Sequence, residues 1–463
     1  MRTDLKQHFA LGRSALAALA MALLLHGCGV YSRVDNRDIR VQQPIEDWVY
    51  KLDMPVSRSG DILVMLGFSG GGTRAAAFSY GVLKALRDVH FEDNGKNIRL
   101  LDEVDSISSV SGGSFTAAYY GLFADRIFQD YERKFLKNNV QKVLLNGIFN
   151  PLNWWKMLTT GFDRTELAVD YYDNYIFDGK TFADLKATHG PYIQINATDL
   201  GMGNRFSFTQ GYFDLLCADY DSFSIARAVA ASSAVPIAFA PVVLENYDTC
   251  TIKYPDWFAS TRQRAEGDLR LAELLKAVDS YMDKKKRKFI HLVDGGITDN
   301  LGIRALYDRV SLLGGTRRAA AQLAKNNNVK KLVVILVNAQ THASQPMEAS
   351  PDEPPVSQVI DAVTDAQLQR YNTESLILVE YNLRKWAAEL STPGHEIKSY
   401  FINVGFDAIG DKDLRQTFNN IATSFALPSD EVDDLVDTAR TLLRNDAEFQ
   451  RLLRDIHARW ESE

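Results

Sequence analysis

Three glycine-rich turns hold the residues of this chain whose types and spacing suit chemistry. The first, Gly70-Gly71-Gly72, follows an apolar run at 61–66. Consecutive glycines let several backbone N–H groups converge on one anion. A phosphate-binding P-loop would continue with Gly-Lys-Ser/Thr, which does not follow here. A dinucleotide site would need an acidic residue at the end of the next strand, where serines and glycines stand instead. Both kinds of nucleotide site are therefore disfavoured.

The second turn presents a serine. Ser111 follows an apolar stretch at 101–110, and its neighbours Ser109, Gly112 and Gly113 are small. Small neighbours permit the strained strand-to-helix turn that exposes a nucleophilic hydroxyl. Backbone N–H groups from the first turn would then stabilise the oxyanion of a tetrahedral intermediate. The two turns together predict a nucleophile and its oxyanion hole.

The third turn offers a base. Asp294 ends the run 289–294 and is followed by Gly295 and Gly296. A serine hydroxyl is a weak nucleophile until an adjacent group takes its proton. The ordinary pKa of an aspartate is about 3.9, so we expect burial in a low-dielectric site to make Asp294 a better base.

A histidine base is the alternative within hydrolases. His342 and His395 follow Asp294 in the chain order of a Ser-Asp-His triad, and both lie near predicted strand ends. The glycine loop, however, is preceded by Ser69 and lacks the histidine of the HGGG motif that accompanies this triad. The pattern therefore favours direct proton transfer from Ser111 to Asp294.

Strands alternating with helices must position these turns. Helical apolar spacing covers 73–90 and 113–123, directly after the first two turns. Alternation of this kind predicts an α/β fold, with a mostly parallel central sheet covered by helices on both faces. The carboxyl ends of parallel strands share one edge, where such sheets bind ligands, so the three turns are predicted to converge there. The predicted strands are 61–66, 101–110, 192–198, 289–293, 331–337 and 398–404.

The motifs closely resemble those of the patatin-like phospholipases. That family carries a Gly-Gly-Gly-x-Arg oxyanion segment, a Gly-x-Ser-x-Gly elbow, an Asp-Gly-Gly or Asp-Gly-Ala turn, and a small-residue and proline segment before the aspartate. Here Ser109 stands in place of the first glycine of the elbow. Order and spacing agree over about residues 59–310. The matching segments are Gly70-Gly71-Gly72-Thr73-Arg74, Ser109-Val110-Ser111-Gly112-Gly113, Ala230-Ala231-Ser232-Ser233-Ala234-Val235-Pro236 and Asp294-Gly295-Gly296.

The resemblance implies a phospholipase A or lysophospholipase-like activity on the acyl esters of membrane lipids. It implies a Ser111-Asp294 dyad with an acyl-enzyme intermediate and with no cofactor and no metal. Arg74, grouped with the three glycines in the oxyanion segment, would support the oxyanion loop or face a lipid phosphate. An alternative from another class is a non-catalytic lipoprotein that binds lipids in a patatin-like pocket. Binding alone needs neither Ser111 nor Asp294, so the intact pair disfavours it.

The N-terminus has the pattern of an exported lipoprotein. A basic start leads into a 12-residue apolar stretch at 14–25, too short to span a bilayer as a helix. Leu25-His26-Gly27-Cys28 follows and resembles the lipobox of bacterial lipoproteins, in which cleavage leaves the cysteine lipidated at the new N-terminus. Gly29 rather than Asp comes next, which favours the outer membrane. We therefore expect a signal peptide at 1–27 and a palmitate-type acyl anchor on Cys28.

Export would place the rest of the chain in an oxidising compartment. Cys217 and Cys250 are able to form a disulfide there. Membrane lipids are thus expected both as substrate and as anchor, with the body in the periplasm or at the cell surface. The net charge of −7 disfavours nucleic-acid binding.

The remaining segments complete the predicted organisation. Residues 28–58 are polar, and this composition predicts a tether. The patatin-like core spans 59–405 with helical insertions, and 406–463 forms a C-terminal helical appendage. The basic run 284–288 precedes the strand of Asp294, so it is expected as a solvated face at the sheet edge opposite the site.

Overall fold

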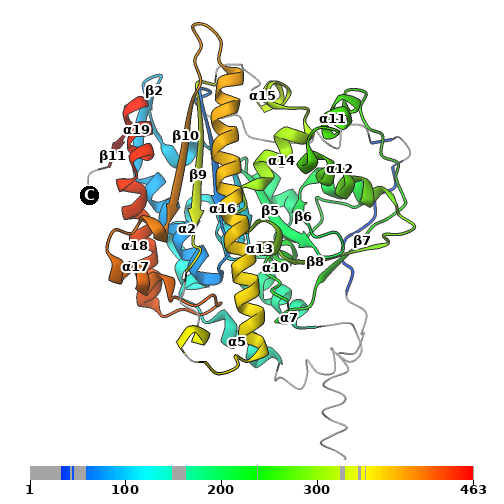
Figure 1. Ribbon diagram of the computed structural model, residues 1–463, viewed down its shortest axis with the longest axis horizontal. Coiled ribbons are helices and arrows are strands. Elements are labelled where there is room, and N and C mark those ends of the chain that lie inside the picture. Colours follow the sequence, from blue (N-terminus) through cyan, green and yellow to red (C-terminus); the bar gives the residue numbers. More distant parts are fainter. Residues whose placement is uncertain are drawn as a thin grey trace, which may run out of the picture.

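An eight-stranded sheet forms the centre of the molecule (Figure 1). The computed structural model describes residues 33–41, 44–45, 59–148, 163–236, 238–323, 329–342, 346–349 and 351–461. Cys28 and the predicted signal peptide lie outside these residues. None of the described helices combines the length and apolar character that crossing a bilayer requires.

The sheet is mainly parallel, as the sequence predicts. Its strands follow the order β10-β9-β1-β4-β5-β8-β7, with β6 paired to β5 off this path. The five strands from β10 to β5 run parallel to their neighbours. The strands are β1 Ile62–Phe68, β4 Val104–Val110, β5 Tyr192–Asp199, β6 Asn204–Phe208, β7 Val242–Glu245, β8 Phe289–Asp294, β9 Lys331–Asn338 and β10 Lys398–Gly405.

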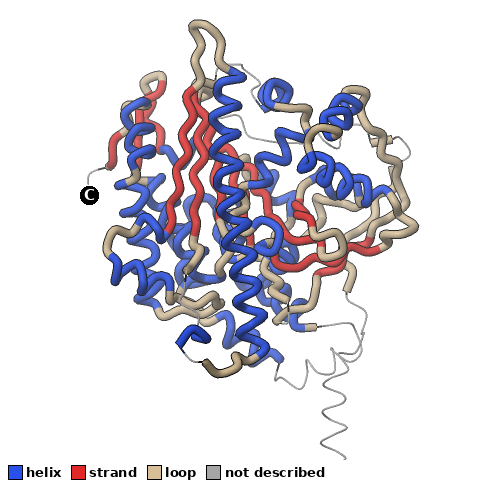
Figure 2. Tube along the Cα trace, in the orientation of Figure 1, coloured by secondary structure: helices blue, strands red, loops and turns tan. Residues whose placement is uncertain are grey.

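Helices cover both faces of this sheet (Figure 2). Strand β9 shows why, because its apolar residues alternate between two separate cores. Val333, Ile335 and Val337 pack into the larger core, which includes residues of helices α2 (Gly72–Arg87) and α3 (Gly112–Phe123). Leu332, Val334 and Leu336 pack into a smaller core under helices α14 (Arg304–Leu312) and α16 (Val356–Leu390). An apolar run buried on both faces is typical of a parallel strand between helical layers.

The two helices predicted after the first two turns are present as α2 and α3, and several further helices lie in stretches for which no element was predicted. The predicted helix 73–90 ends at Arg87, because His90 belongs to a strand. The 35-residue helix α16 lies in a stretch to which the sequence analysis assigned no element. The principal helices are α2 Gly72–Arg87, α3 Gly112–Phe123, α4 Ile127–Tyr131, α5 Val140–Ile148, α7 Arg164–Tyr171, α8 Phe182–Ala187, α9 Gln210–Leu215, α10 Ile225–Ser232, α11 Phe258–Ala265, α12 Leu269–Met282, α13 Gly296–Asp299, α14 Arg304–Leu312, α15 Thr316–Leu323 and α16 Val356–Leu390.

The C-terminal segment packs on the body as a helical appendage, with α17 Lys412–Asn419, α18 Ser429–Asn445 and α19 Ala447–Asp455. Helix α18 lies against α2, and its apolar face, which includes Leu435 and Ala439, joins the larger core. The chain then closes a three-stranded sheet of order β11-β2-β3. This small sheet, formed by β2 Val89–Asp93, β3 Lys96–Arg99 and β11 Arg459–Trp460, was not predicted.

The strand that carries Asp294 runs antiparallel to β5, so the expectation of a further parallel strand is wrong. Strand β6 pairs with residues 195–199 of β5 and occupies one of its edges. Along the opposite edge, Val110 of β4 pairs with Asn196, and Asp294 of β8 pairs with the next residue, Ala197. Strands β4 and β8 therefore meet tip to tip along one edge of β5. The carboxyl ends of both strands still converge. They do so because β8 approaches β4 from the opposite direction, which the sequence did not show.

Residues 33–41 and 44–45 contact the body, so the prediction of a tether over 28–58 is wrong for these described residues. Val34 forms a β-bridge with Val243 in strand β7. The Asn36 side chain donates to the Glu245 carbonyl at 2.8 Å and accepts the Glu245 N–H at 2.8 Å. The folded body therefore starts well before residue 59.

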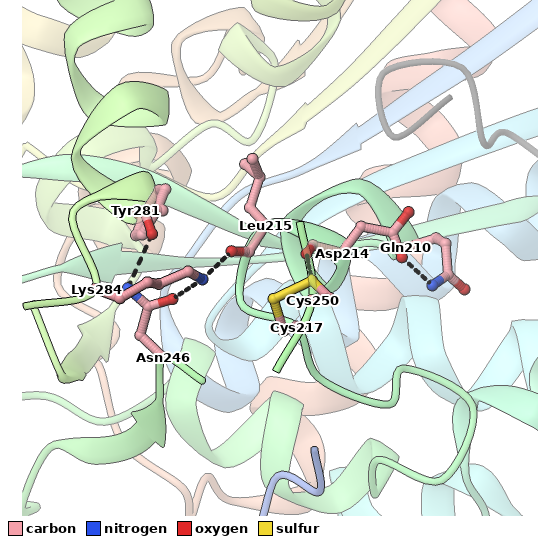
Figure 3. The surroundings of a disulfide bond; sticks show 8 residues. All are labelled: Gln210, Asp214, Leu215, Cys217, Asn246, Cys250, Tyr281 and Lys284. Carbon is pink, nitrogen blue, oxygen red and sulfur yellow. Dashed lines mark hydrogen bonds between the residues drawn. A yellow bond between two sulfur atoms is a disulfide. The ribbon is translucent and has the colours of Figure 1, made fainter. Parts of the chain in front are cut away.

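A disulfide joins Cys217 and Cys250 beside this segment (Figure 3). The Lys284 ammonium donates to the Leu215 carbonyl at 2.5 Å and to Asn246 Oδ1 at 2.6 Å. The disulfide and Lys284 together connect the chain between β7 and β8 to the end of helix α9 (Gln210–Leu215). The antiparallel half of the sheet is thus fastened by contacts between residues far apart in sequence.

The basic run 284–288 does not lie at the edge opposite the site, because β8 runs antiparallel to β5. Its Arg287 pairs at 2.6 Å with Asp199, the last residue of β5, so the run lies beyond the carboxyl end of that strand. Lys285, Lys286 and Lys288 are exposed, whereas Lys284 and Arg287 bind inward. Only part of the run is therefore a solvated face.

Candidate active site

Ser111 occupies a strained turn between β4 and α3. Its φ of 50° and ψ of −123° are unusual for a residue with a side chain. Gly112 allows the turn to pack, since a Cβ there would stand 1.9 Å from the Gly72 carbonyl oxygen. Strain of this kind persists only where the surroundings enforce it, and it is characteristic of a nucleophile elbow. The geometry is the one that the spacing of small residues predicts.

Asp294 faces this serine directly. The Ser111 hydroxyl donates to Asp294 Oδ2 at 2.8 Å. The other carboxylate oxygen, Oδ1, accepts the N–H of Gly296 at 2.7 Å. Burial raises the pKa of Asp294 to about 6, against the opposing effect of these two hydrogen bonds. The carboxyl is therefore a stronger base than an ordinary aspartate and is still ionised at neutral pH.

The glycine loop closes one wall of the site. A Cβ on Gly70 would stand 3.2 Å from Ser111 Cβ, so the loop lies against the nucleophile. The Gly70 N–H is already engaged, because it donates to the Asn300 carbonyl at 2.9 Å. This corrects the assignment of Gly70 as an oxyanion donor.

The N–H groups of Gly71 and Gly72, unlike that of Gly70, lie at the start of helix α2. Gly71 precedes α2 with a φ of 139°, and Gly72 begins α2 with a φ of 58°, both suited to glycine. Gly112 likewise begins α3. The first N–H groups of a helix find no acceptor within it and carry the positive end of its dipole. Two helix N-termini thus meet beside Ser111, an arrangement suited to a developing negative charge.

Arg74 supports the glycine loop from behind, which is one of its two predicted roles, whereas the alternative places in the oxyanion hole itself or against a lipid phosphate are wrong. The side chain is 4% exposed. Its Nε donates to the Ala339 carbonyl at 3.0 Å and its Nη1 to the Ile421 carbonyl at 2.5 Å. The guanidinium also lies against Gly71, 3.1 Å from where a Cβ would stand. Arg74 therefore fixes the start of α2 to the end of β9 and to the C-terminal segment.

The structure explains the residue types at the two remaining elbow positions, Ser109 and Gly113. Ser109 is fully buried in β4, and its hydroxyl donates to the Gln194 carbonyl at 3.2 Å. Serine is thus accommodated where the family pattern has glycine. Gly113 packs against β1, since a Cβ there would come within 2.8 Å of Phe68.

Ser232 is a site residue to which the sequence analysis gave no role. Its hydroxyl accepts the Ser111 N–H at 2.9 Å, donates to the Asn196 carbonyl at 2.6 Å, and hydrogen bonds to the Ser114 hydroxyl at 2.9 Å. Its own carbonyl accepts the Gly295 N–H at 3.1 Å. Ser232 therefore connects the elbow, strand β5 and the aspartate turn. The signal was its place in the small-residue segment 230–236.

The histidines of the alternative triad lie elsewhere. His342 Nε2 is 3.7 Å from Asp407 Oδ2, and His395 Nε2 lies 3.1 Å from the Val329 carbonyl near the amino ends of β9 and β10. Within the described part of the chain, no histidine hydrogen bonds to Ser111 or Asp294. The same residues contain no group of three or more His, Cys, Asp or Glu side chains placed to hold a metal ion.

Comparison with known families agrees with this site. The model of the patatin-like phospholipases matches residues 66–307, which include all three glycine-rich turns. The chain belongs to the patatin-like phospholipase family, whose members are lipid acyl hydrolases.

Solved structures similar to this chain include human GIVD cytosolic phospholipase A2, with 11% identity and a TM-score of 0.46. The alignment covers 89% of this chain and 64% of the human protein, less than two thirds of its length. The same human enzyme in complex with methyl gamma-linolenyl fluorophosphonate aligns at 11% identity with a TM-score of 0.41, over 89% of this chain and 61% of that one. No curated protein matches the sequence.

Proposed function

We propose that this protein is a serine acyl hydrolase that cleaves fatty-acyl esters of membrane glycerolipids, in the manner of a phospholipase A or lysophospholipase. The observation that carries the proposal is the 2.8 Å hydrogen bond from the strained Ser111 to the buried Asp294. A nucleophile and base within this distance satisfy the geometric requirement for covalent catalysis.

The first half-reaction forms an acyl-enzyme. Asp294 Oδ2 takes the hydroxyl proton while Ser111 Oγ attacks the ester carbonyl carbon. The resulting oxyanion faces the N–H groups of Gly71, Gly72 and Gly112, each able to supply a few kcal/mol of transition-state stabilisation. Collapse of the tetrahedral intermediate breaks the ester bond, and the protonated Asp294 returns the proton to the departing alkoxide. The products are the lipid alcohol and an ester on Ser111.

The second half-reaction restores the enzyme. Asp294 Oδ2 now takes a proton from a water molecule, which attacks the acyl carbon. The same N–H groups stabilise the second oxyanion. Ser111 leaves with the proton from Asp294, and the fatty acid is released. A pKa near 6 suits both directions of this transfer, because the group is ionised at rest and still returns the proton readily.

Replacement of the nucleophile tests the proposal. Ser111→Ala should lose hydrolysis of a short-chain ester by about 10⁴-fold or more, since the remaining site has no nucleophile. Circular dichroism should show an unchanged fold, because one oxygen is removed from a turn that accepts small residues. A fluorophosphonate probe should label the wild-type protein at Ser111 and leave the variant unlabelled. Full activity in the folded variant contradicts the mechanism.

We also propose that Cys28 carries an acyl anchor that attaches the protein to the bacterial outer membrane. The support is the signal-peptide pattern and the Leu-His-Gly-Cys sequence. Several acyl chains, at about 0.8 kcal/mol per buried methylene, make such attachment effectively permanent. Cys28→Ser should be recovered without detergent and should not incorporate a palmitate analogue that labels the wild-type protein. Equal labelling of both proteins excludes this cysteine as the lipidation site.

A further inference from the structure

The packed N-terminal segment leaves very little chain between the proposed anchor and the folded body. Arg33 already contacts the body, with Nη1 3.7 Å from Glu166 in α7. Asp35 reaches the nearly buried Arg227 in α10 at 2.7 Å, and Arg227 also binds Glu166 through two hydrogen bonds. Cys28 is five residues before Arg33, a separation that a fully extended chain spans in at most about 18 Å. An anchor at Cys28 would therefore hold the α7 region close to the bilayer.

Ser111 and the glycine loop follow the carboxyl ends of β4 and β1, and these parallel strands point toward the same end of the molecule. In Figure 1 the arrows of β9 and β10 point to the lower end, where α5, α7 and the start of α16 also lie. Specific contacts connect α5 to the site: Thr73 donates its N–H to the Ser424 carbonyl at 2.9 Å, and Gln141 of α5 donates to the neighbouring Phe425 carbonyl at 3.3 Å. Helix α5 is thus separated from the glycine loop by a single segment. The anchor and the site share one end of the body.

Exposed apolar side chains project from elements at this end. Val356 and Val359 in the first turn of α16 are 75% and 42% exposed. Leu145 of α5 is 46% exposed. Tyr175, in the helical turn Tyr172–Ile176 that continues α7, is 64% exposed and stacks on Tyr171 at 5.0 Å. Apolar and aromatic side chains of this kind stabilise a protein surface at the headgroup and acyl boundary of a bilayer.

We propose that this end of the molecule, defined by Leu145, Tyr175, Val356 and Val359, is a bilayer-contacting face, and that the contacts of Arg33 and Asp35 with the body hold it against the membrane to which Cys28 is attached. The enzyme would then act on lipids of its own membrane. The occupant is a lipid bilayer because the reach from Cys28 keeps Arg33, and with it the adjoining helix α7, within about 18 Å of one. This inference rests on the proposed function, in particular on the proposed lipidation.

The first experiment tests where the bilayer-contacting face lies, and it needs no catalytic activity. In the Ser111→Ala protein acylated at Cys28, an environment-sensitive fluorophore is attached at Val356→Cys or, as a matched control, at Leu269→Cys in α12, which is 77% exposed away from this end. The proteins are reconstituted into vesicles of phosphatidylethanolamine and phosphatidylglycerol with brominated acyl chains. We expect at least twofold stronger quenching of the probe at 356 than of the probe at 269. Equal quenching, or none at either position, overturns the proposal.

Binding and turnover supply the second test, with unacylated Cys28→Ser protein and plain vesicles. The double variant Val356→Asp/Val359→Asp should sediment with vesicles at least fivefold less than its parent. Its ratio of vesicle-lipid to short-chain-ester turnover should fall by the same factor, whereas Leu269→Asp should stay within twofold. Unchanged sedimentation of the double variant overturns the proposed face. Failure of every protein to hydrolyse either ester would instead contradict the proposed function and leave the quenching result standing.

Discussion

The two halves of the central sheet contribute different parts of the site by different means. In the parallel half, β1 and β4 each lead directly through a glycine-rich turn into a helix, and these turns carry Gly71, Gly72 and Ser111. In the antiparallel half, β8 approaches from the other direction and brings Asp294 to meet the tip of β4. The first half is built from local strand–turn–helix units. The second is assembled from segments far apart in the chain.

The nucleophile and the base therefore have different physical requirements. The nucleophile needs a strained backbone, which a buried strand and a glycine-rich helix start provide locally. The base needs burial and a defined position, which long-range hydrogen bonds provide, from the Asp294 N–H to the Ala234 carbonyl and from the Gly295 N–H to the Ser232 carbonyl. Local sequence changes should therefore disturb the parallel half, whereas loss of long-range connections should disturb the antiparallel half. The following predictions test that division, from the largest effect to the smallest.

Asp294→Asn removes the base and keeps the shape of the side chain. We expect a loss of about 10⁴-fold or more in kcat, roughly 5 kcal/mol of barrier, because an amide cannot accept the Ser111 proton. In the wild-type protein, kcat/KM should fall as the pH drops through about 6, the pKa of the buried carboxyl. Steady-state kinetics between pH 4.5 and 8.5 measures both effects. A variant that keeps substantial activity would assign the base to another group.

The same variant should be more stable than the wild type at neutral pH. Burial raises the folded-state pKa of Asp294 to about 6 from an unfolded value of 3.8, so the ionised carboxylate destabilises the fold above pH 6. The penalty declines as the pH falls from 6 to 3.8 and is absent below. Thermal melts at pH 8 and pH 4 should show a higher melting temperature for Asp294→Asn only at pH 8.

Ser232→Ala removes the hydroxyl that connects the elbow to β5 and α3, and it keeps the backbone carbonyl that accepts the Gly295 N–H. The Ser111 N–H loses its acceptor, at a cost of about 1–3 kcal/mol for an unsatisfied buried group. We expect kcat to fall by about 10- to 100-fold with KM nearly unchanged, because Ser232 positions the nucleophile without touching substrate. Ser232→Thr retains the hydroxyl and should recover part of the rate, whereas Ser233→Ala in the same segment serves as a control. A large rise in KM with unchanged kcat would exclude a positioning role.

The disulfide should affect stability more than chemistry. Cys217→Ser/Cys250→Ser releases a sequence separation of 33 residues, which corresponds to about 3–4 kcal/mol in the loop-entropy model. We expect a melting temperature lower by several degrees and a loss of activity within about tenfold at 25 °C. Reduction of the wild-type protein should reproduce the shift, and the double variant should not respond to reductant. An unchanged melting temperature would show that other contacts suffice to hold the antiparallel half.

The histidine variants should show the smallest effects. His291→Ala, His342→Ala and His395→Ala should each retain activity within about tenfold, or 1.4 kcal/mol of barrier, because none contacts Ser111 or Asp294 in the described structure. Ester hydrolysis by the three purified variants, compared with Ser111→Ala, is the measurement. A folded variant as inactive as Ser111→Ala would identify its histidine as the base and replace the dyad by a triad.

Sequence alone determined the components of the site. Ser111, Asp294 and the glycine loop stand out because strand–turn–helix chemistry is local, so the required small residues must be neighbours in the chain. The same locality explains why the predicted strands of the parallel half agree with β1, β4, β5, β9 and β10. Apolar runs buried on both faces are visible without knowledge of their partners.

Only the tertiary structure decided how the components meet. The direction of β8 could not be predicted, because an apolar run does not show whether the neighbouring strand is parallel or antiparallel to it. Gly70 and Arg74 look like members of one oxyanion motif, yet the carbonyls of Asn300, Ala339 and Ile421 engage them, and these acceptors lie more than 200 residues away. The packing of residues 33–41 and 44–45 and the contacts of Ser232 likewise depend on residues far away in the chain. Each depends on groups that only folding brings within hydrogen-bond distance.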